Sequence, residues 1–269
     1  MAALVLGSSG YVGRHLMNVD TSLVGGCRSV SEDQQSIFVD VSKFTVETLK
    51  SIFDVFEVII ALPWYVSHHD YKFSDENFIW KNIYIEKIIP AFIQSRAGYI
   101  LSTGTCLEYG NTSVGPLNIN SALEPRCKYG QAKVDTYQEL RKEVLDAGKK
   151  YCWVRPFFVF GNDNNDNKLF PSIQSTLEKG DNFVFKEPEN VNDYIHVKKL
   201  VKDIHFLASK KIEGTFNLGS GYPIRNIDLL DILRGISDPQ KRLAAQYYSQ
   251  DIGLFCSDAF NPTSDWIIE

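Results

Sequence analysis

The chain has 269 residues, of which 44% are hydrophobic and 13% aromatic, which is enough apolar material for a complete hydrophobic core. The net charge is −5 and the lysines and arginines are scattered, which argues against a nucleic-acid partner because such proteins gather basic residues on one face. The longest apolar stretch, residues 58–66, contains Pro63 and is well short of a membrane span.

Short apolar runs alternate with amphipathic stretches in the first part of the chain. Strand-like runs occur at residues 3–6, 22–27, 36–41, 57–62, 98–102 and 151–154, and helix-like stretches at 12–18, 75–94 and 133–146. Strands that alternate with helices in this way are joined by right-handed crossovers. The pattern therefore predicts an α/β fold with a doubly wound parallel sheet of the Rossmann type.

The character of the sequence changes after about residue 156. Residues 161–168 (GNDNNDNK) read as a polar loop, and the later elements are shorter and mixed. We expect a dinucleotide-binding Rossmann domain at 1–155 and a smaller, mixed substrate-binding lobe at 156–269. Within that second part, residues 190–218 are expected to return to the Rossmann sheet.

A glycine-rich turn, GSSGYVG at residues 7–13, joins the first predicted strand to the first predicted helix. Gly7 permits a tight turn, Gly10 lets the backbone approach a pyrophosphate, and Gly13 permits close packing of the helix on the sheet. The N-terminus of the helix offers N–H groups and the positive end of its dipole to the anion. A turn that binds nothing is the alternative, but the position between strand and helix favours a dinucleotide site.

The end of the second strand distinguishes NAD from NADP. An acidic residue there binds the ribose of NAD, whereas this chain has Arg28 and no acid before Glu32. A guanidinium suits a 2′-phosphate by its charge and its forked donors, and Arg14 offers a second positive group, so the sequence favours NADP. NAD is the alternative, with Arg28 as a solvated surface residue.

Further contacts to the dinucleotide are expected at the turn and after the third and fourth strands. Asp40, at the end of the third strand, is a candidate contact for the adenine, or alternatively caps the following helix. The residues expected to contact the dinucleotide are Gly7, Gly10, Tyr11, Val12, Gly13, Arg28, Asp40, Val41, Ala61, Leu62, Tyr129 and Lys133.

Tyrosine and lysine at a spacing of four carry the expected chemistry. Reduction of a ketone needs a proton donor that faces the carbonyl oxygen and a second hydroxyl that orients this oxygen. Tyrosine titrates at about pH 10, and a lysine on the same helix face supplies a charge that lowers its pKa. Two such pairs occur, Tyr129/Lys133 and Tyr194/Lys198.

The surroundings of the two pairs differ. Tyr129 opens a predicted helix and follows Thr105, which lies at the carboxyl end of a buried strand. Sites in open α/β sheets form at that edge. We therefore expect Tyr129 and Lys133 to be catalytic, with Thr105 as the second hydroxyl, and the pair at Tyr194 to be structural.

Six motifs follow one another in an order typical of a known family. They are GSSGYVG at 7–13, STGTCLEYG at 102–110, KYGQAK at 128–133, VRPFFVFG at 154–161, DYIHV at 193–197 and FNLGSG at 216–221. In these motifs the chain resembles the extended short-chain dehydrogenases/reductases, which are NAD(P)-dependent epimerase/dehydratase enzymes that act on nucleotide sugars. The resemblance implies a catalytic triad of Thr105, Tyr129 and Lys133, and Asn82 resembles the helix asparagine of the family.

The positions at which the chain departs from the family pattern reduce the number of reactions to be expected. Dehydratases of the family carry Asp-Glu directly after the catalytic Thr, where this chain has Cys106 and Leu107, so 4,6-dehydration is not expected. Arg28 and the similarity of STGTCLEYG to nucleotide-sugar 4-ketoreductases favour an NADP-dependent reductase of a keto sugar, with a nucleotide-linked 4-keto-6-deoxy sugar as substrate. The alternatives are an NAD-dependent nucleotide-sugar 4-epimerase and a non-catalytic dinucleotide-binding sensor.

The expected substrate lobe also departs from the family. Many members carry Arg immediately before DYIHV to hold the diphosphate, and this chain has Asn192. Arg225 and Lys168 are candidates for the missing charge, and Leu169 begins a segment that resembles the family's sugar-nucleotide lining. Glu108 is a further candidate for substrate contact or acid/base chemistry, unless it simply points outward.

The remaining features indicate an ordinary cytoplasmic enzyme. No metal site is expected, because His68 and His69 have no third ligand at metal spacing. The five cysteines form no Cys-x-x-Cys pair and the first apolar run is too short for a secretory signal, so a reduced, cytoplasmic protein is expected. A homodimer is compatible with the apolar faces of the helices at 75–94 and 133–146.

Overall fold

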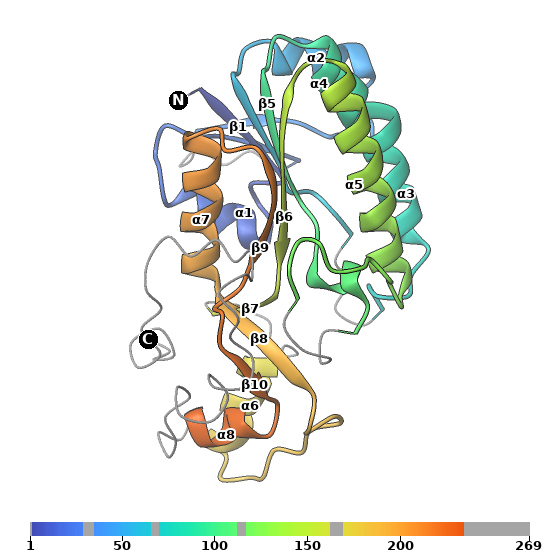
Figure 1. The fold of residues 1–269 in the computed structure, drawn as a ribbon. Helices are drawn as coiled ribbons and strands as arrows, with labels where there is room; N and C mark the ends of the chain where they lie inside the picture. Colours follow the sequence, from blue (N-terminus) through green and yellow to red (C-terminus); the bar gives the residue numbers. More distant parts are fainter. Residues whose placement is uncertain (1, 29–34, 66–69, 112–116, 162–168, 234–269) are drawn as a thin grey trace.

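A seven-stranded parallel sheet forms the centre of the computed structural model, which describes residues 2–28, 35–65, 70–111, 117–161 and 169–233. The strand order is β3-β2-β1-β4-β5-β6-β9 (Figure 1), so the order reverses between β1 and β4 as in a Rossmann sheet. The strands are β1 (Ala3–Leu6), β2 (Val24–Cys27), β3 (Ser36–Phe38), β4 (Val58–Ala61), β5 (Tyr99–Thr103), β6 (Lys150–Pro156) and β9 (Gly214–Leu218). The predicted α/β Rossmann fold is confirmed.

The strands of the large sheet are apolar because helices cover both of its faces. Successive residues of a strand point to opposite faces, so Leu4 and Leu6 join one core cluster while Ala3 and Val5 join the other. The first face carries α2 (Val46–Phe53), α3 (Glu76–Ile83), α4 (Ile89–Gln94) and α5 (Lys128–Asp146), and the second carries α1 (Tyr11–Met17) and α7 (Val197–Ser209) (Figure 1).

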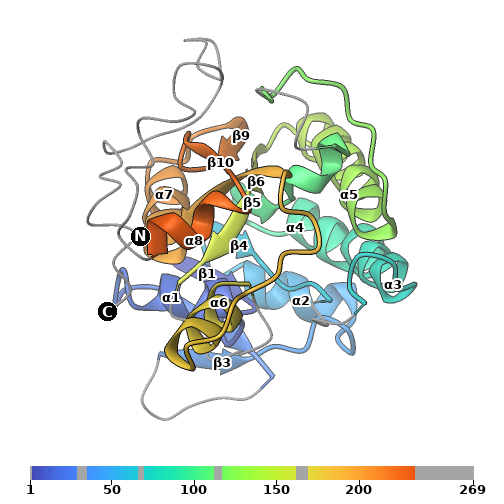
Figure 2. The ribbon, with the colours of Figure 1, turned by 90° about the horizontal axis from the view of Figure 1, so that it is seen from below.

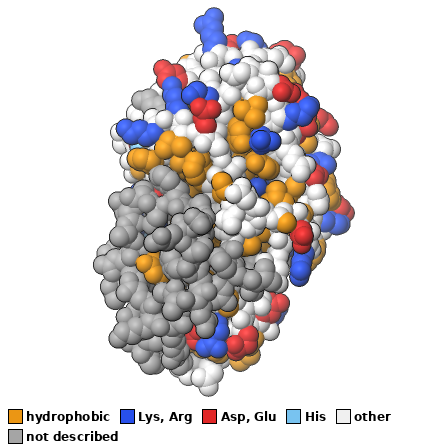
Figure 3. Space-filling view, in the orientation of Figure 1, with side chains coloured by type: hydrophobic (Ala, Val, Ile, Leu, Met, Phe, Trp, Pro, Cys, Tyr) orange, Lys and Arg blue, Asp and Glu red, His pale blue; other side chains and the backbone are white. Residues whose placement is uncertain are grey.

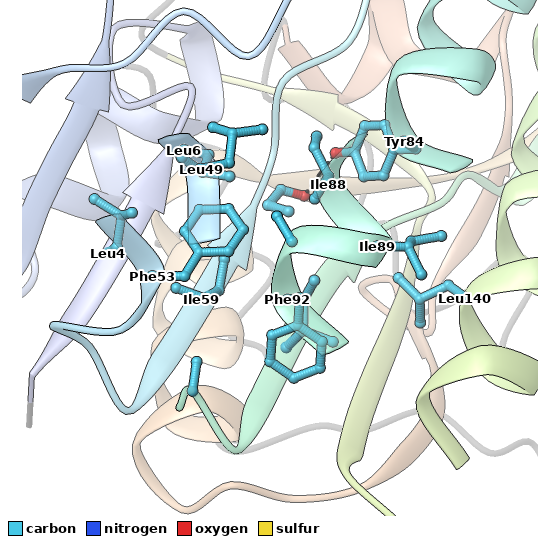
Figure 4. Packing of buried hydrophobic residues seen from close by; sticks show 14 of the residues in the cluster. Leu4, Leu6, Leu49, Phe53, Ile59, Tyr84, Ile88, Ile89, Phe92 and Leu140 are labelled. Carbon is cyan, nitrogen blue, oxygen red and sulfur yellow. Dashed lines mark hydrogen bonds between the residues drawn. The ribbon is translucent and has the colours of Figure 1, made fainter. Parts of the chain in front are cut away.

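Large side chains from sheet and helices interlock on the first face (Figure 4). Phe53 of α2, Ile59 of β4 and Phe92 of α4 are fully buried in this cluster, and Leu140 adds α5 to it. Complete burial of one such side chain contributes about 1.5–3 kcal/mol. This core therefore fixes α5, which carries Tyr129 and Lys133, on the sheet.

The long helix predicted at 75–94 is present but changes its winding in the middle. Between α3 and α4 the chain makes a π-helical turn, η1 (Tyr84–Ile88), just before Pro90. Proline has no N–H for the regular hydrogen bond of an α-helix, and a wider turn accommodates that loss. Within the turn, the Tyr84 hydroxyl donates a hydrogen bond to the carbonyl oxygen of Ala61, 3.1 Å away at the end of β4.

A smaller sheet of three strands lies beyond the carboxyl ends of the large sheet (Figures 1 and 2). Its order is β10-β8-β7, with β8 parallel to β7 and antiparallel to β10. Phe160, Phe170 and Tyr194 pack together in its core. The elements of this lobe are β7 (Phe158–Phe160), α6 (Leu169–Glu178), β8 (Val191–His196), β10 (Pro223–Arg225) and α8 (Asp228–Leu233).

The stretch 190–218, expected to return to the large sheet, is divided between the two sheets. The expectation is wrong for the first part of this stretch, because β8 pairs with β7 and β10 in the smaller sheet. It is correct for the rest, since α7 packs on the large sheet and β9 pairs with β6. The Asp193 carboxylate accepts hydrogen bonds from the N–H groups of Ser220 and Gly221, which ties β8 to the chain after β9. Residues 234–269 of the expected second lobe lie outside the described ranges.

Charged side chains of both signs are mixed over the described part of the face shown in Figure 3. Ion pairs form at the surface, such as Lys50 with Asp54 and Lys150 with Glu213, each at 2.7 Å. The surface drawn there has no basic stripe of the kind that binds nucleic acid. Within the part of the chain that the structure describes, no helix has the length and apolar character needed to cross a membrane.

Candidate active site

The glycine-rich turn lies between β1 and α1, as the sequence predicts. Gly7 has a φ of 76°, a left-handed conformation that favours glycine, and a Cβ on Gly13 would lie 2.2 Å from the carbonyl oxygen of Gly7. The third glycine therefore allows contact of the helix with the turn itself, rather than only with the sheet. Gly10 is the exposed N-cap of α1 and has no side chain to cap the helix. These residues fit the pyrophosphate of a dinucleotide.

Arg28 and Asp40 lie just beyond β2 and β3, at the carboxyl edge of the sheet. Arg28 is exposed. Exposure is compatible both with binding of a 2′-phosphate and with a solvated surface residue. Asp40 is buried, and its carboxylate accepts hydrogen bonds from the hydroxyl and the N–H of Ser42, which hold the pKa of Asp40 below its usual value. The alternative that Asp40 caps the next helix is wrong, because Thr45 is the N-cap of α2.

The other expected cofactor residues lie close to the same edge. Tyr11 and Val12 open α1, and the Tyr11 hydroxyl donates a hydrogen bond to the carbonyl oxygen of Gly161 after β7. Ala61 ends β4, and the N–H of the next residue, Leu62, donates to the carbonyl oxygen of Leu6 at 3.2 Å. Val41 is buried in the core on the first face of the sheet.

Tyr129 and Thr105 meet at the carboxyl end of β5. The helix α5 begins at Lys128, so Tyr129 lies in its first turn, and Thr105 follows β5 by two residues. Burial raises the pKa of Tyr129, and a hydrogen bond with the Thr105 side chain acts in the opposite direction. The structure thus brings the two expected hydroxyls together.

Lys133 lies one helical turn after Tyr129, with its Nζ 5.8 Å from the centre of the Tyr129 ring. Its Nζ donates a hydrogen bond to the carbonyl oxygen of Thr103 at 2.6 Å and lies 3.7 Å from the centre of the Trp64 ring. In this arrangement burial, and not Lys133, is the largest influence on the pKa of Tyr129. Lys133 is only 1% exposed, and burial lowers its own pKa to about 7 while Glu108 opposes that shift.

Trp64 belongs to the site, although no sequence motif marks it. It follows β4 by three residues, and its ring covers the Lys133 ammonium group. A cation over an indole face is stabilised by the ring quadrupole. The ring also packs against Tyr84 and Tyr129, with centroids 5.3 and 6.4 Å apart. Its place after a central strand is the signal that sequence reasoning passed over.

A buried asparagine holds Trp64 and the chain before α3. Asn77 is 0% exposed and accepts a hydrogen bond from the Trp64 indole N–H at 2.9 Å. Its amide also donates to the carbonyl oxygen of Tyr71, whose ring packs edge-on against Tyr129 at 5.3 Å. Asn82, which resembled the family's helix asparagine, is exposed, so Asn77 is the asparagine of this helix that supports the site.

Glu108 does not point outward. It is 0% exposed, and its carboxylate accepts hydrogen bonds from Arg155 Nε at 2.6 Å and from the Thr105 N–H at 2.8 Å. Burial raises the pKa of Glu108 and the Arg155 guanidinium opposes that shift. The expectation of direct substrate contact through Glu108 is therefore corrected, because its carboxylate lies beneath Thr105 and is enclosed by protein.

The expected substrate residues of the smaller lobe are engaged within the lobe. Arg225 pairs with Asp228 at 2.9 Å and with Glu189 at 3.1 Å, so its charge is already matched and the expected replacement of the diphosphate-binding arginine is not supported. Asn192 donates a hydrogen bond to Asn226 at 3.0 Å. Leu169 opens α6 and packs against the lobe core. Lys168 lies outside the described residues.

The second Tyr-x-x-x-Lys pair differs from the first. Tyr194 lies in β8 and Lys198 in α7, so the two residues do not share a helix face. The Tyr194 hydroxyl donates to Asn226 at 2.7 Å inside the lobe core. This arrangement fits a structural role.

The residues after Thr105 offer no acid or base for elimination of water. Cys106 is buried, and burial raises the pKa of its thiol to about 12. Leu107 has no ionisable group. Among the described residues, no group of three or more His, Cys, Asp or Glu side chains is arranged to hold a metal ion; His68 and His69 lie outside them.

A turn that fits a pyrophosphate and a tyrosine–lysine pair at the carboxyl edge of a Rossmann sheet define an NAD(P)-dependent class of enzyme. Residues 3–219 match the model of the NAD dependent epimerase/dehydratase family, and the chain belongs to that family. It is therefore an NAD(P)-dependent enzyme, and the sensor alternative is set aside.

Individual relatives are distant but cover nearly the whole chain. The dTDP-6-deoxy-L-talose 4-dehydrogenase (NAD(+)) of Aggregatibacter actinomycetemcomitans is 23% identical over 83% of this chain and 86% of its own length. A UDP-glucose 4-epimerase of Streptococcus mutans is 24% identical over 99% of this chain and 91% of its own. The solved UDP-N-acetylglucosamine 4-epimerase of Methanobrevibacter ruminantium M1, in complex with UDP-N-acetylmuramic acid, shares the fold with a TM-score of 0.74 at 17% identity, over 100% of this chain and 92% of that one.

Proposed function

We propose that this chain is an NADP-dependent reductase of a keto sugar, with a nucleotide-linked 4-keto-6-deoxy sugar as its substrate. The observation that carries the proposal is the approach of the Thr105 side chain to the Tyr129 hydroxyl at the carboxyl end of β5, beside the buried Lys133. The similarity to a dTDP-6-deoxy-L-talose 4-dehydrogenase supports it, because oxidation of a 4-hydroxyl is the reverse of reduction of a 4-ketone.

In this proposal Tyr129 gives its proton to the carbonyl oxygen as the ketone becomes an alcohol, and Thr105 donates a hydrogen bond to the same oxygen. Burial raises the pKa of Tyr129, so its hydroxyl is protonated at neutral pH, and a nearby cation is needed to make it a better proton donor. The protonated form of Lys133 favours the tyrosinate that remains after proton transfer. The dinucleotide, when bound at the glycine-rich turn, supplies the hydride.

NADP is proposed as the dinucleotide because the chain has an arginine, Arg28, and not an acid directly after β2. A guanidinium pairs with a 2′-phosphate, whereas a carboxylate would bind the 2′-hydroxyl of NAD. NAD, which the name of the dehydrogenase relative specifies, is the alternative. Its binding would leave Arg28 solvated.

A nucleotide-sugar 4-epimerase is the second candidate, and the UDP-glucose 4-epimerase relative that aligns with 99% of this chain favours it. An epimerase would use Thr105, Tyr129 and Lys133 to oxidise and then re-reduce one carbon. It would differ from the reductase in retaining its dinucleotide through the cycle. Net consumption of the dinucleotide therefore separates the two reactions.

The test is to incubate the purified protein with a dTDP-linked 4-keto-6-deoxyhexose and either NADPH or NADH. We expect loss of the reduced nicotinamide absorbance in proportion to the alcohol formed, faster with NADPH, and a single C4 epimer by NMR. Interconversion of UDP-glucose and UDP-galactose without net consumption of the dinucleotide would place the epimerase first. Absence of both reactions would refute the proposal.

A further inference from the structure

A fully buried ion pair lies directly beneath Thr105. Glu108 is 0% and Arg155 1% exposed, and Arg155 Nε lies 2.6 Å from Oε2 of Glu108. The other carboxylate oxygen, Oε1, accepts the Thr105 N–H at 2.8 Å and the indole N–H of Trp153 at 3.1 Å. Arg155 also donates to the Tyr109 hydroxyl at 3.0 Å. Both oxygens of the carboxylate are thus held from several sides.

Thr105 and Glu108 cap the short helix η2 (Cys106–Tyr109) reciprocally. The Thr105 hydroxyl oxygen accepts the N–H of Leu107 at 3.3 Å, while the Glu108 carboxylate accepts the N–H of Thr105. A hydroxyl whose oxygen already accepts a backbone hydrogen bond keeps its own hydrogen for donation. The cap therefore fixes the position of the hydroxyl that neighbours Tyr129 and leaves its hydrogen available for donation.

The surrounding chain is shaped to admit this carboxylate. A Cβ on Gly104 would lie 2.0 Å from Oε1 of Glu108 and 2.3 Å from the indole nitrogen of Trp153. Replacement of a buried ion pair by apolar side chains often leaves stability unchanged or improves it. Stability alone is therefore a weak reason for this arrangement, whereas its direct hold on the Thr105 backbone gives it a specific effect.

We propose that Glu108, anchored by Arg155, is a positioning residue that fixes the Thr105 hydroxyl as a hydrogen-bond donor toward the reacting oxygen. Glu108 itself touches neither substrate nor dinucleotide in this proposal. The inference rests on the proposed function, because it assigns Thr105 a contact with the sugar oxygen.

The first experiment compares Glu108→Gln with Asp203→Asn. Asp203 is a matched control, since it is also 0% exposed and paired with a cation, Lys199, at 2.9 Å, but lies on α7 away from Thr105. Both substitutions neutralise a buried carboxylate, so both are expected to lower the melting temperature. Only Glu108→Gln is expected to lower kcat, by about 10–100-fold, because a small misplacement of a reacting group has effects of that size. The KM for the sugar and the affinity for NADPH should stay near the parent values, and equal losses of kcat in both variants would overturn the proposal.

The second experiment asks whether Glu108 acts through Thr105. Thr105→Ala alone is expected to lower kcat by about 10²–10³-fold, as does loss of one preorganised donor. In the Thr105→Ala background, Glu108→Gln should lower kcat by less than about 3-fold more, because the group that it positions is already gone. Losses that multiply in the double variant would show that Glu108 acts independently of Thr105 and would overturn the proposal.

Two further measurements keep the test decisive. If Glu108→Gln fails to fold, the double variant Glu108→Leu/Arg155→Met removes both charges together and takes its place in the same kinetic comparison. If the parent enzyme turns over none of the sugars, the proposed function fails, and crystal structures of parent and variant then decide the positioning role. A displaced or rotated Thr105 side chain in the variant supports that role, and an unchanged one contradicts it.

Discussion

At the carboxyl edge of the large sheet, three polar side chains are buried and hydrogen-bonded: Thr105, Glu108 and Lys133. In the smaller lobe, by contrast, the Arg225 side chain is 39% exposed and pairs with carboxylates of the same lobe. The first group gathers partners from β5, β6, η2 and α5. The partners of Arg225 come only from residues close to β10.

This difference indicates which part of the molecule holds its polar side chains in one fixed arrangement. A buried polar network is costly to leave half satisfied, so its members stay in one arrangement. An exposed ion pair contributes only about 0–1 kcal/mol and restrains its side chains weakly. We therefore expect the reaction type to depend on the sheet edge, and substitutions of lobe charges to have small effects.

The two Tyr-x-x-x-Lys pairs give the sharpest contrast between the regions. Tyr129→Phe is expected to lower kcat by about 10²–10⁴-fold, because it removes the proton donor, with the affinity for the dinucleotide unchanged. Tyr194→Phe should leave kcat near the parent value and lower the unfolding free energy by about 1 kcal/mol, through loss of the hydrogen bond to Asn226. Steady-state kinetics and urea unfolding measure both. A comparable loss of kcat in the two variants would remove the distinction between the pairs.

Lys133→Met should lower activity and raise stability. The pKa of Lys133 is lowered by burial from 10.5 to about 7 in the folded protein, so between these pH values the unfolded chain binds more protons and the parent gains stability as pH rises. The variant lacks that penalty and is expected to be more stable at pH 7 by about 1–3 kcal/mol, a gain that shrinks toward pH 10.

Urea unfolding at about pH 7 and pH 9.5 measures this stability difference within the window in which Lys133 titrates. Lys198→Met, at the exposed lysine of the second pair, is the control and should show no such gain. A gain for Lys133→Met that is equal at both pH values would mean that the buried ammonium is not its source.

Much of the fold was predictable because its signals are local and periodic. Apolar runs such as residues 58–61, bounded by a polar residue and a turn, predict buried parallel strands, and GSSGYVG predicts the first turn. The helix α2 was not predicted, because it is only eight residues long and its start is set by the Thr45 hydroxyl, which accepts the N–H of Thr48. The π-helical turn before Pro90 was also missed, because the sequence pattern around it is that of a continuous helix.

The site was predictable where one motif brings its own geometry, as at Tyr129 and Lys133 on one helix. It was not predictable where partners come from distant strands. Glu108 is paired with Arg155, 47 positions later in β6, and Trp64 meets Lys133 only through the packing of α5 on the sheet. A charged residue in sequence looks solvated until its buried partner is known, which is why Glu108 was placed on the surface of the site.

A smaller effect is expected at Arg28, which lies on the cofactor half of the sheet edge. Arg28→Ala should weaken NADPH binding by about 10-fold, because one charge-assisted contact to the 2′-phosphate is lost. NADH has no such phosphate and serves as the internal control, with unchanged affinity. Fluorescence titration with the two dinucleotides measures the effect. Equal weakening of both, or a parent that prefers NADH, would return Arg28 to a solvated role and favour NAD.

The smallest effect is expected in the smaller lobe. Arg225→Gln should change the KM for a nucleotide-linked sugar by less than about 3-fold and the unfolding free energy by no more than about 1 kcal/mol, because the guanidinium is partly exposed and already matched by Asp228 and Glu189. A KM raised 10-fold or more for the nucleotide-linked sugar, without change for the same keto sugar lacking the nucleotide, would contradict this. Arg225 would then have to leave its carboxylate partners to bind the diphosphate. The fixed sheet edge and the weakly held lobe would in that case both contribute to one substrate-binding site.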